Sequence, residues 1–324
     1  MILFINFPKW ISAEIISGLP IRWYGLMYVF AFLTTYIIFR YQARKKEIEI
    51  TADETQSLFM FCIVGLLLGA RLFSVLIYNG TSYYWLHPWL IFWPFSNGQF
   101  VGLPGMSYHG GLVGAIIGGV IYSSKNKRNF FEIADALSLG IPLGYTFGRL
   151  GNFINGELWG RVSFSKIAVL FPYADKFSTN YQWVRDAADK VNIPYVLGDF
   201  INLPRHPSQL YEAFFEGIVL FLFMWFFIRP RRSKKYYGYG LSWYLIGYGT
   251  IRFFIEYFRE PDLNLGFIIQ LNSKANNPAL LQSFLNFSMG QIFCILMVLA
   301  GIILSLVLKN KQKKALEAKN DSRK

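Results

Sequence analysis

The chain of 324 residues contains few of the residues that build disulfide, redox or metal sites, with only two cysteines and three histidines. Cys62 and Cys294 both fall inside apolar runs, so neither is placed for a disulfide. His87, His109 and His206 lie far apart and form no HExxH or similar ligand spacing. We therefore expect no disulfide, no metal site and, since no nucleotide-binding loop is present, no cofactor.

Charge is also scarce, because only 16% of the residues are charged while 54% are hydrophobic and 19% aromatic. This composition does not fit a soluble domain. A bilayer core of about 30 Å needs roughly 20 apolar helical residues per span. Windows of this kind occur at residues 21–40, 57–78, 108–123, 133–149, 209–228, 238–258 and 288–308. We therefore expect an all-α integral membrane protein with seven transmembrane helices.

The basic residues predict its orientation. Nineteen of the 32 Lys and Arg lie in four segments, at 40–46, 125–128, 229–235 and from 309 onward. With seven spans these segments share one side, which the positive-inside rule makes cytoplasmic, leaving the N-terminus outside and the C-terminus cytoplasmic. The net charge of +13 is then explained by loops that meet membrane lipids, so we do not expect nucleic-acid binding.

This topology predicts three external segments and two domains. The external segments are at about 79–107, 150–208 and 259–287. The domains are a single transmembrane domain, residues 1–308, and a basic cytoplasmic tail, residues 309–324.

Several charged residues fall inside the apolar windows, where ionised groups are costly and mark ion pairs or functional sites. They are Arg71, Asp135, Arg149, Glu212, Glu216, Arg252 and Glu256. We interpret Arg71 and Asp135 as structural anchors. Glu212 and Glu216 are four apart and share a helix face, and we expect them to pair with Arg71 or Arg149, with a proton relay as the alternative.

A polar stripe follows the sixth window, where Tyr248, Arg252, Glu256 and Arg259 are spaced by four, four and three residues. Two interpretations fit Arg252. It forms a purely structural salt bridge with Glu256, or it offers its planar donors to a phosphate or carboxylate while Glu256 orients it.

His109 opens the third window in SYHGGL and is followed by several glycines. A histidine at a span end is either an interfacial hydrogen-bonding group or a general base near neutral pH. The GLPG at 102–105 is similar to a segment of intramembrane serine proteases, but the GxSG nucleophile pattern of that class is absent.

The most polar stretch is GRLGNFINGELWGR, residues 148–161, at the end of the fourth window. Its glycines favour tight turns with exposed amides, and Asn152, Asn155 and Glu157 stand between Arg149 and Arg161. Such a segment suits an anionic headgroup. A polar turn that only satisfies its own backbone is the alternative.

This stretch resembles the signature of the bacterial prolipoprotein diacylglyceryl transferases, Gly-Arg-x-Gly-Asn-Phe-x-Asn-x-Glu-x-x-Gly, at every fixed position. Further similar blocks are WYGLMY (23–28), SYHGGL (107–112), RHPSQLYE (205–212), GYGTIRFFIEYFREPD (247–262) and SMGQ (288–291). The resemblance implies transfer of the diacylglyceryl group of phosphatidylglycerol to the lipobox cysteine of a preprolipoprotein, forming a thioether and releasing glycerol phosphate. It also implies the bacterial cytoplasmic (inner) membrane, with the active site toward the outer leaflet.

The resemblance implies roles for individual residues. The catalytic residues are His109, Arg149 and Arg252, and the substrate-binding residues are Arg149, Tyr24, Asn152, Asn155, Glu157, Gly160, Tyr248 and Glu256. Arg149 is expected to bind the headgroup, and His109 to act as the base for the thiol or as a hydrogen-bonding positioner. Residues 162–203 and 262–287 depart from the family pattern. A transporter or a structural scaffold would also bury such charges, although no internal repeat supports a transporter.

Overall fold

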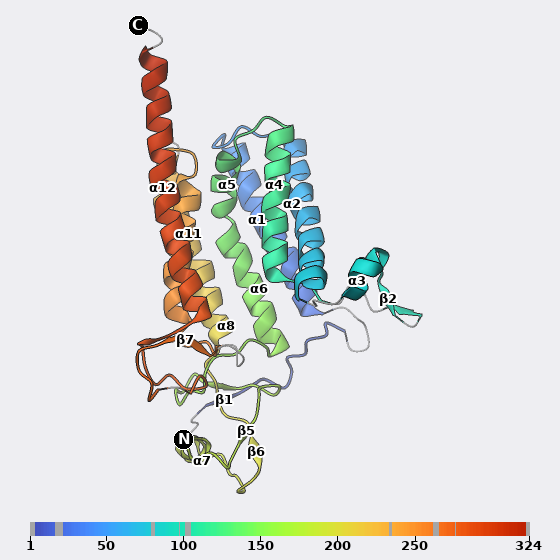
Figure 1. Cartoon of the computed structure of the whole chain (residues 1–324), viewed down its shortest axis with the longest axis vertical. Coiled ribbons are helices and arrows are strands. Elements are labelled where there is room, and N and C mark those ends of the chain that lie inside the picture. Colours follow the sequence, from blue (N-terminus) through green and yellow to red (C-terminus); the bar gives the residue numbers. More distant parts are fainter. Residues whose placement is uncertain are drawn as a thin grey trace. The chain divides into compact units, whose positions relative to one another are not determined.

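The computed structural model describes residues 4–16, 22–78, 82–96, 98–100, 105–232, 235–261, 266–275 and 277–321, and most of them are helical (Figure 1). The chain divides into two compact units. The first comprises Met1–Phe39 and Asp135–Lys324, and the second comprises Arg40–Ala134.

Helices coincide with all of the predicted windows. The first four windows contain α1 (Trp23–Arg44), α2 (Ala52–Phe73) with the π-helical η1 (Ser74–Tyr78), α4 (Tyr108–Lys125), and α5 (Phe130–Ser138) with α6 (Ile141–Asn155). The fifth window is a continuous helical run of five elements, α8 (Ser208–Tyr211), η3 (Glu212–Val219), α9 (Leu220–Phe223), η4 (Met224–Ile228) and α10 (Arg229–Arg232). The last two windows contain α11 (Tyr239–Ile255) and α12 (Met289–Asp321). The fourth window is divided into α5 and α6, because Gly140 precedes α6 and Pro142, which lacks an N–H donor, lies in its first turn.

Among the described residues, four helical stretches are long and apolar enough to cross a membrane, namely Trp23–Arg44, Ala52–Ile77, Ser208–Arg232 and Met289–Ala315. This supports a mostly helical, multi-pass membrane protein. The helices α6 and α11 have 15 and 17 residues, and α4 combines many glycines with polar ends. The count of seven spans stays a prediction.

In the second unit, α2 and α4 pack with their backbones in contact. A Cβ atom on Gly65 would lie 2.3 Å from the carbonyl oxygen of Gly114, and one on Gly69 would lie 2.3 Å from that of Gly110. Only glycine permits this approach. The segment between the two helices contains α3 (Ser82–Leu86), the 3₁₀ turn η2 (Pro88–Ile91) and the antiparallel strands β2 (Phe95–Ser96) and β3 (Gln99–Phe100).

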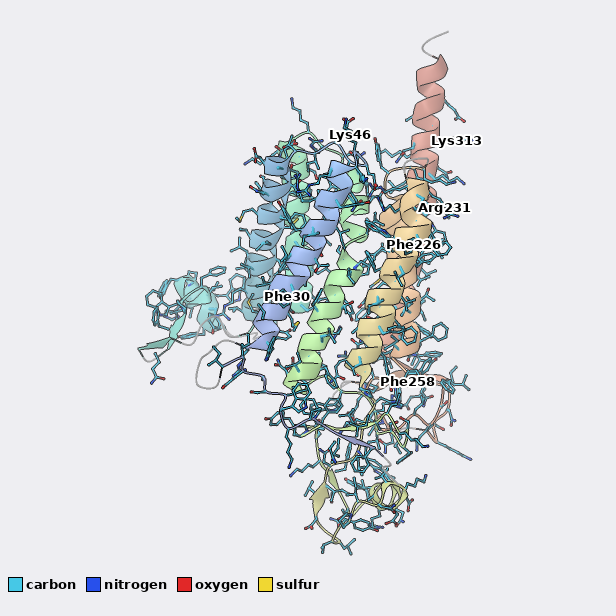
Figure 2. The ribbon with its side chains drawn as sticks, turned by 180° about the vertical axis from the view of Figure 1, so that it is seen from behind. Phe30, Lys46, Phe226, Arg231, Phe258 and Lys313 are labelled. Carbon is cyan, nitrogen blue, oxygen red and sulfur yellow. The ribbon has the colours of Figure 1, made fainter. Side chains whose placement is uncertain are left out.

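In the first unit, small residues again bring helices together, since Gly144 of α6 packs on the backbone of Ala31 in α1. Asp135 accepts hydrogen bonds from the N–H groups of Gly238 and Leu241, both at 2.8 Å, and so caps α11 from another helix. The expectation that Asp135 is a structural anchor is confirmed. Figure 2 shows Arg231 and Lys313 toward one end of this unit's long helices, and Phe258 toward their other end, where the lobe of short elements begins.

Outside its long helices, the first unit has a lobe of short elements. They are the parallel pair β1 (Ile5–Asn6) and β4 (Val169–Leu170), the antiparallel pairs β5 (Phe177–Ser178) with β6 (Phe200–Ile201) and β7 (Phe267–Gln270) with β8 (Asn286–Ser288), and α7 (Gln182–Val191). The helix α7 buries Val184, Ala187, Ala188 and Val191, the spacing of an amphipathic helix. Its apolar face packs on Val162 and Leu203 to form the lobe's core.

Candidate active site

Three arginines and three glutamates meet inside the first unit. They are Arg149 at the end of α6, Glu212 and Glu216 on η3, Arg252 on α11, and Glu256 and Arg259 just beyond α11. With all six groups ionised, the cluster has no net formal charge. Such balance is how a membrane protein tolerates buried charge.

Glu212 is the centre of the cluster, and its side chain is fully buried. Its carboxylate lies 2.7 Å from Arg149 Nε, 2.9 Å from Arg252 Nη1 and 3.4 Å from Arg259 Nη1. The prediction that one of the two η3 glutamates pairs with Arg149 is confirmed. A carboxylate shared by three guanidinium groups joins α6, η3 and the end of α11 in one network.

Arg252 forms ion pairs with carboxylates through both terminal nitrogens. Nη1 lies 2.9 Å from Glu212 and 3.4 Å from Glu216, and Nη2 lies 2.9 Å from Glu256. The predicted Arg252–Glu256 salt bridge is therefore present, within a larger network than the sequence indicates. The alternative interpretation, in which Arg252 also binds a phosphate, stays a prediction.

Tyr145 is a member of the site that sequence reasoning missed. Its hydroxyl accepts from Arg149 Nε at 2.6 Å and donates to Glu216 at 2.6 Å. The guanidinium carbon of Arg149 also lies 4.8 Å from the centre of the Tyr145 ring, a cation–π contact. The sequence contains one signal for this contact, because Tyr145 and Arg149 are four residues apart on α6 and so share a helix face.

Arg149 keeps a donor available. Its contacts use Nε and Nη1, the latter donating to Asn152 Oδ1 at 3.4 Å. Within the described ranges, Nη2 of Arg149 has no hydrogen-bond partner, and the side chain is 16% exposed. An anion that reaches the site can therefore bind this nitrogen without breaking an existing ion pair.

The signature turn orients Arg149 through two successive side-chain hydrogen bonds, from Arg149 to Asn152 and from Asn152 to Glu157. α6 ends at Asn155, Gly156 adopts the left-handed conformation at φ 66°, and the Glu157 N–H donates to the Asn152 carbonyl at 3.1 Å. The Glu157 carboxylate accepts from Asn152 Nδ2 at 2.8 Å and from Asn155 Nδ2 at 3.4 Å. The turn thus satisfies its own backbone and also orients the arginine.

Gly160 lies where a side chain has no room. A Cβ there would lie 2.3 Å from the carbonyl oxygen of Phe258 and 2.8 Å from His206 Cβ. The Gly160 N–H donates to the His206 carbonyl at 2.9 Å. Close approach of three chain segments therefore requires glycine at this signature position.

Two buried arginines lie behind the signature turn. Arg161 donates to the carbonyls of Arg259 and Leu280, both at 3.0 Å, and burial lowers its pKa to about 10. Arg205 forms an ion pair with Glu260, where burial lowers the pKa of Arg205 and raises that of Glu260. These contacts tie the lobe to the end of α11.

His206 is packed between aromatic rings, with Phe258 at 5.2 Å and Tyr211 at 5.9 Å between ring centres. Burial, followed by the positive charge of Arg161, lowers the pKa of His206 to about 4. The imidazole is therefore neutral near pH 7. Sequence reasoning placed His206 only within the RHPSQLYE block.

The remaining predicted residues fall into two groups. Tyr24 is on α1 and packs on Gly151 of the signature, and Tyr248 is on α11 with its ring 5.8 Å from that of Tyr145. His109 lies in the first turn of α4, in the second unit. Among the described residues, no group of three or more His, Cys, Asp or Glu is arranged to hold a metal ion.

These features define a multi-pass membrane protein with a buried arginine–glutamate site beside a glycine- and asparagine-rich turn. Residues 11–307 match the family model described as prolipoprotein diacylglyceryl transferase, and the chain belongs to this family. The resemblance found in the signature is thereby confirmed.

Several relatives match nearly the whole chain. The phosphatidylglycerol–prolipoprotein diacylglyceryl transferase of Treponema denticola is 47% identical over 339 residues, covering 99% of each chain. The enzyme of the same name from Treponema pallidum is 48% identical over 316 residues, covering 93% of this chain and 94% of its own. That from Borreliella afzelii is 42% identical over 314 residues, covering 94% of this chain and 95% of its own.

Proposed function

We propose that the protein transfers the diacylglyceryl group of phosphatidylglycerol to the lipobox cysteine thiol of a preprolipoprotein, the first step of lipoprotein maturation. The observation that carries this proposal is the Arg149–Glu212–Arg252 network, because Arg149 belongs to the family signature and the other two residues lie in further similar blocks. The nucleophile comes from the substrate, in agreement with Cys62 and Cys294, which both lie within helices of the chain.

The chemistry explains why arginines surround the site. A C–S bond forms at the diacylglyceryl carbon as its C–O bond to phosphate breaks, and the thiol proton passes to a base. The phosphodiester, with one negative charge, becomes a monoester that gathers a second one. Arg149 Nη2, which has no partner among the described residues, is the donor that would stabilise this developing charge, and Arg252 supports it through Glu212.

Two buried acceptors suit the glycerol end of the headgroup. Within the described part of the chain, Asn155 Oδ1 and Gln209 Oε1 are buried without a hydrogen-bond partner. Gln209 Nε2 donates to the Glu157 carbonyl, which places Gln209 beside the signature turn. Hydroxyl groups of the headgroup would satisfy such acceptors.

His109 retains its role as candidate base on the strength of the SYHGGL motif. If it accepts the thiol proton, His109→Gln should remove the lower inflection from the pH–rate profile. An active His109→Gln variant with an unchanged profile would leave only the positioning role.

The reaction should be assayed with purified protein, phosphatidylglycerol and a lipobox peptide, using mass spectrometry for the diacylglyceryl adduct and an enzymatic assay for glycerol phosphate. We expect both products in equal amounts. A peptide with serine in place of the lipobox cysteine, and phosphatidylethanolamine in place of phosphatidylglycerol, are the controls. Absence of both products with the complete mixture would contradict the proposal and favour a transporter or scaffold.

The proposed setting is a bacterial cytoplasmic membrane crossed seven times, with the N-terminus outside, the site at the outer leaflet, one catalytic domain over residues 1–308 and a cytoplasmic tail from 309 to 324. Single cysteines at Tyr181 and Lys313, both exposed, should react differently with a membrane-impermeant maleimide in intact spheroplasts. We expect labelling at 181 only. Labelling at 313 alone would show that the orientation is the reverse of the proposed one. In a separate test, an active protein truncated after residue 308 would support the proposed domain boundary.

A further inference from the structure

The segment that connects α2 to α4 has an unusual composition for a loop. From Leu72 to Ser124 the chain contains no Asp, Glu, Lys or Arg, and three of its nine tryptophans lie between residues 85 and 93. Soluble proteins average about one charged residue in four. A connection that lay in water would be expected to carry charge, and this one carries none.

The aromatic side chains of this segment point outward. Trp85, Trp89 and Trp93 are 66%, 64% and 55% exposed, and Tyr83 and Leu86 are also exposed. Ile91, in contrast, is buried. So large an exposed apolar surface marks an interaction site.

The place of the segment in the second unit indicates what covers this surface. The membrane-spanning stretch of α2 ends at Ile77, five residues before α3 begins at Ser82. On the return side, the Ser107 N–H donates to the Ala70 carbonyl at 2.9 Å, so α4 begins level with the last turns of α2. Figure 1 shows α3 and β2 projecting sideways from this end of α2. The segment therefore leaves the end of a candidate membrane span and returns to the same level in α4.

Arg71 fastens the segment to α2. This arginine is buried in the last turn of the helix, donates from Nε to the Ile91 carbonyl at 2.5 Å and from Nη1 to the Gly105 carbonyl at 3.3 Å. Gly105 has φ +78°, a conformation that favours glycine, and a Cβ there would lie 3.0 Å from Ser74 Oγ. The Arg71 side chain thus binds the middle of the segment, at Ile91, and the stretch just before α4, at Gly105.

We propose that residues 82–96 form an aromatic anchor that lies in the membrane–water interface at the end of α2, with Trp85, Trp89 and Trp93 among the phospholipid headgroups and Arg71 fixing its position. Tryptophan is suited to this layer because its ring is apolar and its indole N–H finds polar partners there. The partner is the phospholipid surface itself. The proposal does not depend on the catalytic function.

Nitroxide labels test this depth directly. In a Cys62→Ala, Cys294→Ala background, single cysteines at Trp89 and Trp93 are labelled, and the protein is reconstituted in vesicles containing phosphatidylglycerol. Accessibility to oxygen and to a water-soluble nickel complex is compared with lipid nitroxides of known depth and with a label at Leu67, an exposed position in the middle of α2. We expect labels 89 and 93 about 5–10 Å below the phosphates, and label 67 deeper.

Water accessibility at both 89 and 93 would overturn the proposal. If these labels were water-accessible and became immobilised only when a signal peptide was added, the surface would belong to the exported protein, which also overturns it. Arg71→Gln should increase the mobility of label 89, whereas Arg40→Gln, an arginine of the same unit that contacts Thr55, should not. An unchanged label in a folded Arg71→Gln protein would refute the fastening role, and the depth measurement decides the anchor without this variant.

Discussion

Arg149 and Glu212 form an ion pair of 2.7 Å between Nε and Oε2, which joins the end of α6 to the start of η3. The carboxylate is fully buried, whereas the arginine retains some exposure. The pair therefore separates two tasks. Glu212 fixes the guanidinium, and Nη2, which has no partner among the described residues, remains available to a ligand.

Replacing Arg149 should abolish most of the transfer activity. If Arg149 stabilises the departing phosphate, Arg149→Ala should lower kcat by about 100- to 1000-fold, and Arg149→Lys should recover little because a point charge cannot keep both contacts. Product formation by mass spectrometry measures the loss. Lys166→Ala, at an exposed position of the lobe, is the control, and wild-type turnover in Arg149→Ala would contradict the headgroup assignment.

Removing the shared carboxylate should destabilise the fold. Glu212→Gln leaves three arginines without their common partner, and loss of one member of a buried ion pair costs about 3–5 kcal/mol. Thermal unfolding in detergent measures this effect. Glu212→Gln combined with Arg259→Gln should be less destabilised than the sum of the two single variants, and strict additivity would show that the two side chains are not coupled.

Two glycines of the signature should respond differently to alanine. At Gly160 the new methyl group would collide with backbone atoms, while at Gly148 no atom outside the local helix lies within 4 Å of the Cβ position. We expect Gly160→Ala to lower the melting temperature and Gly148→Ala to preserve or raise it, since alanine favours a helix by roughly 0.5–1 kcal/mol. Equal melting temperatures for the two variants would contradict the close packing at Gly160. Lost activity in a stable Gly148→Ala would indicate that substrate uses the open space.

His206 should make stability depend on pH. Its pKa is about 4 in the folded protein against 6.5 for an ordinary histidine, so below pH 6.5 the unfolded chain binds a proton that the folded one does not. Stability should therefore fall as pH is lowered from 6.5 to 4, by at most about 3 kcal/mol. Unfolding of the wild type and of His206→Asn at several pH values measures this, and identical slopes would exclude the histidine as the cause.

The sequence allowed prediction of features that depend on local pattern. Apolar windows coincide with helices because a bilayer demands length and hydropathy, and Arg252 and Glu256 pair because they share a helix face. Contacts between distant segments were not predictable. Tyr145 joins Arg149 to Glu216 only because α6 and η3 approach closely at Gly217, where a Cβ would lie 2.0 Å from Thr146 Oγ1. No spacing in the sequence encodes that approach.

The buried arginines of the lobe illustrate the same limit. Arg161 donates to main-chain carbonyls of Arg259 and Leu280, groups that every residue possesses and that no motif can identify. The sequence therefore indicates that Arg161 is polar and near the signature, and the fold gives it partners.

The glycine contacts between α2 and α4 have a consequence for His109. Because the two backbones touch at Gly65 with Gly114 and at Gly69 with Gly110, α4 cannot slide along α2 without collision. The position of α2 in the bilayer thus determines the position of α4. In bilayers of different thickness α2 adjusts to the hydrocarbon layer, and the first turn of α4 must follow it, so that the histidine keeps a constant depth relative to the end of α2.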